Sequence, residues 1–238
     1  MLGFMLLILI SCDNSNSPTN DNAEIEPITD SISVTIGKQT WMIRNLDVDT
    51  FRNGDRIPDG NDANARWKER GVNKEPVWCY HNNNKTQAYK GVLYNWYAVN
   101  DPRGLAPKGW RIPTKKDWKI LEEYLIAHGY NYDSSRIGNK IGKSLTTSWG
   151  DIVDKEGAIG SLGYNWVINK SKFNALQSYG RDTDGSWPII MFPFTIWWSS
   201  DVDPSGWVYA RCLFPESVGL DEKQVSKNGG YSVRCIKE

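Results

Sequence analysis

The chain has 238 residues, and its 28 basic and 28 acidic side chains cancel to a formal net charge of zero. Since no basic excess draws the chain to DNA, RNA or an anionic membrane surface, composition argues against a nucleic-acid partner. The 12 Trp and 11 Tyr residues are the unusual feature, because such rings bury large areas while keeping a polar group. Composition favours a core built from indoles, and an outward-facing aromatic platform is the alternative.

An apolar run opens the chain and ends at a cysteine. Residues 1–10 are too few to span a bilayer as a helix but have the length of the apolar part of a signal peptide. Residues 9–12 (Leu-Ile-Ser-Cys) resemble the lipobox at which bacterial signal peptidase II cleaves. We therefore predict that residues 1–11 are removed and that Cys12 is lipidated, with palmitate among its acyl chains. A chance cysteine after an ordinary signal is the alternative.

Residues 12–30 are acidic, rich in Asn and nearly free of side chains that a core could bury. We expect a disordered tether that joins the lipid to one globular domain over residues 31–238. This composition resembles the export signals that carry lipoproteins to the cell surface in Bacteroidetes-type bacteria. In enteric-type bacteria, Asp13 would instead resemble an inner-membrane retention signal.

The first elements of the domain are predicted from residue periodicity. Residues 32–36 alternate apolar with polar, Gly37-Lys38 can turn, and residues 41–43 are apolar again, which predicts a β-hairpin. Residues 52–90 are polar and rich in turn formers, which predicts irregular structure. Within residues 91–100, aromatic and apolar side chains fall at helical spacing, so we expect a short buried helix there.

The clearest helix signal begins at Thr114, directly after Pro113. Thr114 can cap the helix and Asp117 follows three residues later, as in a capping box. One apolar stripe then continues to Gly129, which ends the helix. The stripe consists of Trp118, Leu121, Tyr124 and Leu125.

The end of the chain predicts strands over residues 189–200, 206–214 and 230–236, separated by Gly, Pro and Asp. A hairpin, then helices, then a strand-rich end give the α+β class.

Five spaced motifs run through the domain. They are TIGKQTWM (35–42) with Asn45-Leu46, GVLYNWYAV (91–99), PKGWRIPTKKDW (107–118), WWSS (197–200) and YSVRC (231–235). By these motifs the chain resembles the Fibrobacter succinogenes major paralogous domain family over about residues 33–236. The resemblance implies a secreted protein or lipoprotein of Fibrobacter or Bacteroidetes-type bacteria, and so favours a surface-exposed, lipid-anchored place on the outer membrane. It implies no established biochemical function.

The central and last motifs also resemble the sulfatase-modifying (formylglycine-generating) group, whose fold is C-type-lectin-like. This analogy implies a C-type-lectin-like mixed fold with two helices, a twisted antiparallel C-terminal sheet and long irregular loops, but fold alone does not imply function. The chain departs from the family at Ala106, where relatives usually carry a Cys.

With Cys12 lipidated, three cysteines remain. C-type-lectin-like folds often bridge neighbouring C-terminal strands, so the resemblance implies a Cys212–Cys235 disulfide, with two buried free thiols as the alternative. Cys79 is then a small buried apolar residue. An enzyme of the formylglycine-generating kind would need free thiols in its site, and two His residues offer little for zinc or a catalytic triad. We therefore predict no enzyme, and keep such a modifying enzyme as the less favoured alternative.

An aromatic and acidic cluster in the C-terminal half is the candidate ligand site. Its members are Trp187, Trp198, Trp207, Tyr209, Asp182 and Asp184. Neighbouring strand residues point to opposite faces, so Trp197 and Trp198 cannot both be core if only one side of the sheet is covered. An exposed indole beside carboxylates suits sugar rings or a protein partner.

These residues predict a non-catalytic binding or display module for a polysaccharide or an envelope or surface protein. If both indoles are buried, the domain is instead a scaffold for protein–protein interaction. Acidic residues 55–64 and 182–185 offer oxygen ligands for Ca²⁺, but Asp-Gly and Asn-Gly pairs are ordinary turn formers, so we expect no cofactor.

Overall fold

The computed structural model describes residues 32–188 and 194–238. The predicted signal peptide, the lipidated Cys12 and the tether over residues 12–30 lie outside the described residues. Part of the strand predicted over residues 189–200 lies outside them as well.

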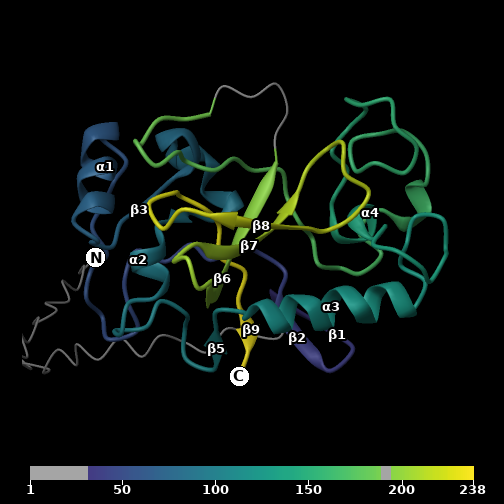
Figure 1. The fold of residues 1–238 in the computed structure, drawn as a ribbon, viewed down its shortest axis with the longest axis horizontal. Helices are drawn as coiled ribbons and strands as arrows, with labels where there is room; N and C mark the ends of the chain where they lie inside the picture. The colour runs from purple at the N-terminus through teal and green to yellow at the C-terminus, as the bar shows by residue number, and fades with distance from the viewer. Residues whose placement is uncertain (1–31, 189–193) are drawn as a thin grey trace, which may run out of the picture.

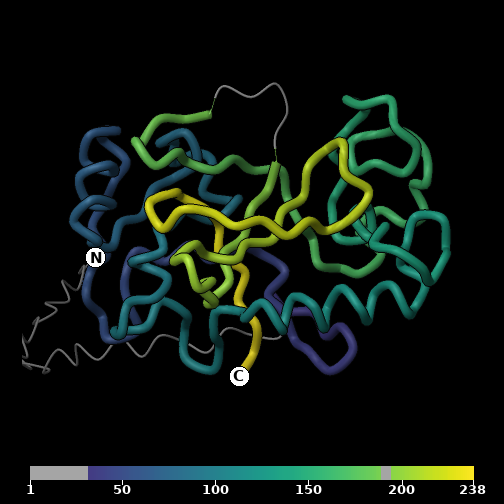
Figure 2. The backbone as a smooth tube through the Cα atoms, viewed as in Figure 1, coloured from purple at the N-terminus to yellow at the C-terminus, as the bar shows by residue number. Residues whose placement is uncertain are grey.

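The N-terminal hairpin forms as predicted and belongs to a four-stranded antiparallel sheet (Figure 1). Its strands are β1 (Ser33–Ile36), β2 (Gln39–Met42), β9 (Ile236–Lys237) and β5 (Trp110–Arg111), in that spatial order. Gly37 makes the turn with a φ of +62°, and a Cβ there would lie 2.7 Å from the ring of Tyr124. Because β9 pairs with β2, the C-terminus of the chain lies near the N-terminal hairpin (Figure 2).

A second antiparallel sheet runs through the middle of the molecule. It consists of β6 (Thr195–Val202), β7 (Val208–Leu213) and β8 (Asp221–Val225), paired in that order. We did not predict β8, because its sequence is polar except for its last residue. The strand predicted over residues 230–236 is regular only where β9 begins, and its earlier part meets β6 in a bridge between Ser232 and Trp197.

Residues 52–90 are less irregular than predicted. They contain α1 (Asn64–Val72), the strand β3 (Trp78–Cys79) and two 3-10 helical turns over His81–Asn83 and Lys85–Lys90. Residue periodicity does not predict α1, because only Trp67 and Gly71 of that helix are buried. The helix predicted within residues 91–100 is shorter than expected. There β4 (Leu93–Tyr94) pairs with β3 before α2 (Trp96–Val99) begins.

The helix predicted at Thr114 is confirmed as α3 (Lys115–Ala127). Thr114 Oγ1 accepts the N–H of Asp117 at 3.1 Å, and the Asp117 carboxylate accepts the N–H of Thr114 at 2.7 Å, which is the predicted capping box. Beyond the end of α3, the short helix α4 (Gly142–Leu145) and a 3-10 turn (Asn165–Val167) lie among loops at one end of the molecule (Figure 1). Helices and small antiparallel sheets together give the predicted α+β class.

Strand β6 is buried on both faces. Trp198 packs in one hydrophobic core with Tyr94, and Trp197 packs in a second core with Trp41 and Trp118. Side chains of consecutive strand residues point to opposite faces, and both indoles are fully buried, so each face of β6 is covered. Trp197 and Trp198 are therefore core residues, in agreement with the indole-built core that the composition predicts.

The expected Cys212–Cys235 disulfide is absent, since both cysteines are free and buried. β6 separates them: Cys212 of β7 pairs with Ile196 of β6, and Ser232 of the Cys235 segment bonds to Ile196 from the other side. Two strand spacings amount to about 9.5 Å, whereas a disulfide needs Cα atoms within about 7 Å. The implied pairing is wrong because these two segments are not neighbours in the sheet.

Candidate ligand-binding site

Trp198, predicted to contact a ligand, is a core residue. Its Nε1 donates to the carbonyl oxygen of Tyr94 at 2.8 Å, and its ring meets the ring of Tyr231 with 4.9 Å between centroids. Because no part of the indole reaches the surface, the prediction of a ligand contact at Trp198 is wrong.

Trp207 and Tyr209 share a face at one end of the central sheet, because they stand two residues apart along the chain. Trp207 is 49% exposed, and its N–H donates to Asp203 at 2.9 Å. Tyr209 is half-buried under Lys115, whose Nζ lies 3.8 Å from the ring centroid, and pairs across the sheet with Gln224. Of the predicted aromatic surface, Trp207 and Tyr209 therefore form a small patch at this edge of the sheet, which we call the Trp207–Tyr209 edge.

Asp182, Asp184 and Trp187 lie elsewhere, in a loop beside α1. The fully buried Arg181 ties this loop in place by donating to the carbonyl oxygen of Gly60 at 2.7 Å. Trp187 is half-buried with its ring centroid 5.2 Å from that guanidinium, whereas Asp182 and Asp184 are exposed. The structure does not bring these three residues together with Trp207 and Tyr209.

The two acidic loops considered for Ca²⁺ are built as turns. Asp59 Oδ1 accepts the N–H of Asn61 at 2.7 Å, and Asp184 Oδ1 accepts the N–H of Ser186 at 2.9 Å. Such hydrogen bonds two residues along the chain are typical of Asx turns. Among the residues that the structure describes, no group of three or more His, Cys, Asp or Glu side chains is placed to hold a metal ion.

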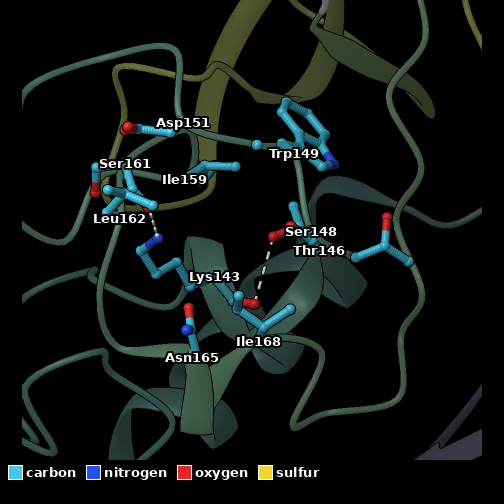
Figure 3. A pocket seen from close by; sticks show the side chains of 12 residues that line it. Lys143, Thr146, Ser148, Trp149, Asp151, Ile159, Ser161, Leu162, Asn165 and Ile168 are labelled. Atoms are coloured by element: carbon cyan, nitrogen blue, oxygen red, sulfur yellow. Dashed lines mark hydrogen bonds between the residues drawn. The ribbon is translucent and has the colours of Figure 1, made fainter.

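A cavity of about 230 Å³ opens among the loops around α4 (Figure 3). Its polar lining side chains include Lys143, Thr147, Ser148, Asp151 and Asn165, and its apolar ones include Trp149, Ile159 and Leu162. Pockets for small ligands combine apolar and aromatic side chains with polar groups that fix the orientation of the ligand. This cavity is the candidate site, and we refer to it as the Lys143 cavity.

The connection between β7 and β8 holds the walls of the cavity together. The N–H groups of Gly142, Ile159 and Gly160 each donate to a carbonyl oxygen within residues 215–218 at 2.9 Å. A Cβ on Gly142 would lie 2.7 Å from the Ile159 side chain, so α4 and the opposite wall approach this closely only with glycine at that position. The walls of the cavity are thus fixed by backbone hydrogen bonds and close packing.

Lys143 brings a buried charge to the cavity. Its side chain is almost fully buried and Nζ donates to the carbonyl oxygen of Ser161 at 2.6 Å (Figure 3). An ammonium group has three donors, and within the described chain this is its one hydrogen bond and no carboxylate lies within 4.0 Å of it. Burial lowers the pKa of Lys143, while the charge of Asp151 acts in the opposite direction.

The other lining residues include a buried indole that packing holds in place and exposed polar side chains. Trp149 is held by the second core and by the bond from its Nε1 to the carbonyl oxygen of Ala175 at 3.3 Å. Ser148 and Asn165 are exposed, and their side chains make no hydrogen bond within the described residues. Leu162, on the rim, is 70% exposed. The cavity therefore presents unused donors and acceptors beside a rigid indole.

We did not predict this cavity from the sequence. Lys143 stands between the buried residues Ile141 and Leu145, and a single lysine in such a run gives no functional signal. The closely spaced glycines Gly157, Gly160 and Gly163 indicate tight loops but not what those loops enclose.

The sequence motifs can now be placed, and they meet in the core. Asn45 Oδ1 accepts hydrogen bonds from Trp197 Nε1 at 2.8 Å and from the buried guanidinium of Arg234 at 2.8 Å. The Fibrobacter succinogenes major domain family matches residues 34–237. The chain belongs to this family. No curated protein and no solved structure matches the chain, so the C-type-lectin-like topology stays a prediction.

Proposed function

We propose that this Fibrobacter succinogenes major domain is a non-catalytic binding module that takes one unit of a polysaccharide in the Lys143 cavity. The observation that carries the proposal is the buried Lys143 ammonium with a single acceptor, Ser161, at the wall of a cavity that also contains an indole. Sugar units suit such a site, because their hydroxyl groups bond to the amide, hydroxyl and acid groups of the lining.

The size of the cavity agrees with this ligand class. At about 30 Å³ for each water molecule, a volume of 230 Å³ corresponds to about seven or eight waters. That space takes one sugar ring with its substituents, while a longer chain would continue across the rim. Leu162 lines the cavity and is exposed, so such a chain would leave the cavity past its side chain.

The cysteines favour a binding role over the modifying enzyme kept as the alternative. Burial raises the pKa of Cys212 and of Cys235 to about 12, so neither thiol is a reactive thiolate near neutral pH. They also lie on opposite sides of β6, too far apart to share one metal ion.

We further propose that the domain is displayed on the outer surface of the outer membrane through a lipid on Cys12. The apolar run and the lipobox-like residues 9–12 support this location. Among residues 32–188 and 194–238, no helix has the length and apolar character needed to cross a membrane. Cys12→Ala should move the protein from the membrane fraction to the soluble fraction, and unchanged fractionation would contradict the lipid anchor.

Binding is tested with the full chain by titration calorimetry against a panel of neutral and acidic monosaccharides and their short oligomers. Asn165→Ala removes an exposed lining group and should weaken binding several-fold while leaving the unfolding midpoint unchanged. Lys116→Met changes an exposed lysine on α3 outside the cavity lining and should leave binding unchanged. If no sugar binds, or if Asn165→Ala has no effect on one that does, the proposal fails.

A second candidate contact is the Trp207–Tyr209 edge, which suits a protein partner on the cell surface. The half-exposed Trp207 beside Asp203 and Gln224 favours it, since exposed indoles flanked by polar groups are common at interfaces. Trp207→Ala should reduce attachment to such a partner and leave sugar binding unchanged.

A further inference from the structure

The charged side chains of the Lys143 cavity indicate which kind of sugar would bind there. Of the charged side chains that line the cavity, Lys143 is almost fully buried and Asp151 is exposed at the rim. A buried cation without a close carboxylate is unfavourable until an anion or several polar groups compensate it. Lys143 is one of the residues that line the cavity, so a negatively charged ligand bound there would compensate this charge as a protein carboxylate otherwise does.

We infer that the cavity selects a sugar that carries a carboxylate, of the uronic acid kind, with the carboxylate against Lys143 Nζ and the ring beside Trp149. This inference rests on the proposed sugar-binding function and specifies its ligand. Two of the three ammonium donors are unused within the described chain, which matches the two oxygens of a carboxylate.

A carboxylate fits better than a phosphate because of the charge balance of the lining. One ammonium compensates the single charge of a carboxylate, whereas a phosphate monoester carries close to two charges near neutral pH. The excess charge of the phosphate would meet Asp151 and find no arginine among the residues that line the cavity. A carboxylate also leaves the ring hydroxyl groups free to bond to Ser148 and Asn165 on the open side.

The experiment compares glucuronate, glucose and glucose 6-phosphate, and likewise galacturonate and galactose, by titration calorimetry with the full chain. We expect the uronate to bind about tenfold or more tightly than the neutral sugar, which is the effect of one charge-assisted hydrogen-bonded pair. The phosphate ester should bind more weakly than the uronate.

Two variants with opposite effects separate ligand recognition from damage to the fold. Lys143→Met should remove the preference for the uronate, and Lys116→Met is its exposed control. Asp151→Asn removes a like charge from the exposed rim, so it should tighten uronate binding a few-fold and leave glucose binding unchanged. Because Asp151 is exposed, this second variant remains informative even if Lys143→Met does not fold.

The outcomes separate this inference from the proposed function. If neutral sugars and uronates bind equally and Asp151→Asn changes neither, the inference is wrong and the sugar-binding function stands. If a phosphate ester binds most tightly, the charge argument is wrong. If no sugar of the panel binds, both are overturned.

Discussion

Replacing Trp198 by alanine should lower the free energy of unfolding of the domain substantially, because that indole is buried in one of the hydrophobic cores. The side chain is fully buried, and burial of this kind is worth about 3–5 kcal/mol when a large aromatic is cut to alanine. The loss includes the hydrogen bond to the carbonyl oxygen of Tyr94, worth about 1 kcal/mol. That oxygen keeps its bond from the N–H of Tyr231 at 3.1 Å, so it is not left without a partner.

For a domain of this size, 1 kcal/mol corresponds to about 2–4 °C in the unfolding midpoint, so Trp198→Ala should lower Tm by about 6–20 °C. Urea unfolding followed by far-ultraviolet circular dichroism measures the free energy of unfolding directly. Trp207→Ala is the matched control, since its indole is 49% exposed and should cost no more than about 1 kcal/mol. If the two variants cost the same, or if Trp198→Ala costs less than about 1 kcal/mol, the two-sided burial of β6 is incorrect.

Two further predictions concern titrating groups. Partial burial alone would raise the pKa of Asp117, but hydrogen bonds from Arg111 and Thr114 outweigh it and bring the pKa to about 2. Since this folded pKa lies below the unfolded value of about 3.8, Asp117→Asn should cost about 2 kcal/mol at pH 7, and urea unfolding should show the cost disappearing between about pH 4 and pH 2. A cost that is the same at pH 7 and pH 2.5 would show that the charge is unimportant. Burial raises the pKa of Cys79, Cys212 and Cys235 to about 12. Iodoacetamide at pH 8 should therefore label none of the three thiols until urea unfolds the protein. Rapid labelling of the native protein would contradict their burial.

The sequence predicted the elements whose signals are local. The capping box at Thr114 and Asp117 lies within one turn of α3, and the hairpin at Gly37 needs only its own alternation. Neither depends on what packs against it from elsewhere in the chain. For that reason the structure confirms both.

The missed elements depend on distant partners. α1 buries little more than Trp67, whose indole donates to the carbonyl oxygen of Asn228 at 2.9 Å, a contact across 161 residues. The polar strand β8 is a strand because β7 pairs with it. No periodicity within either segment carries that information, so neither element can be predicted from its own residues.

The sequence did not predict the candidate site for the same reason. Strand alternation showed that Trp197 and Trp198 point to opposite faces, but not that α3 covers one face and the Tyr94 region the other. The cavity around Lys143 exists because residues 215–218 hold two distant loops together. A lysine whose surroundings come from three separated segments cannot be recognised as a candidate site residue from its neighbours in sequence.

The family motifs and the cavity lie in different parts of the chain, and this separation has a consequence for function. Asn45, Trp197 and Arg234 come from the first, fourth and last motifs and bond to one another in the core. The cavity is built from residues 143–168, between the third and fourth motifs, where no motif falls. Membership of the family therefore accounts for the buried framework of this domain, whereas the ligand that we propose depends on the loops that the framework holds. Because Lys143 lies outside the motifs, the family match alone does not carry the sugar-binding proposal, which depends on the cavity of this chain.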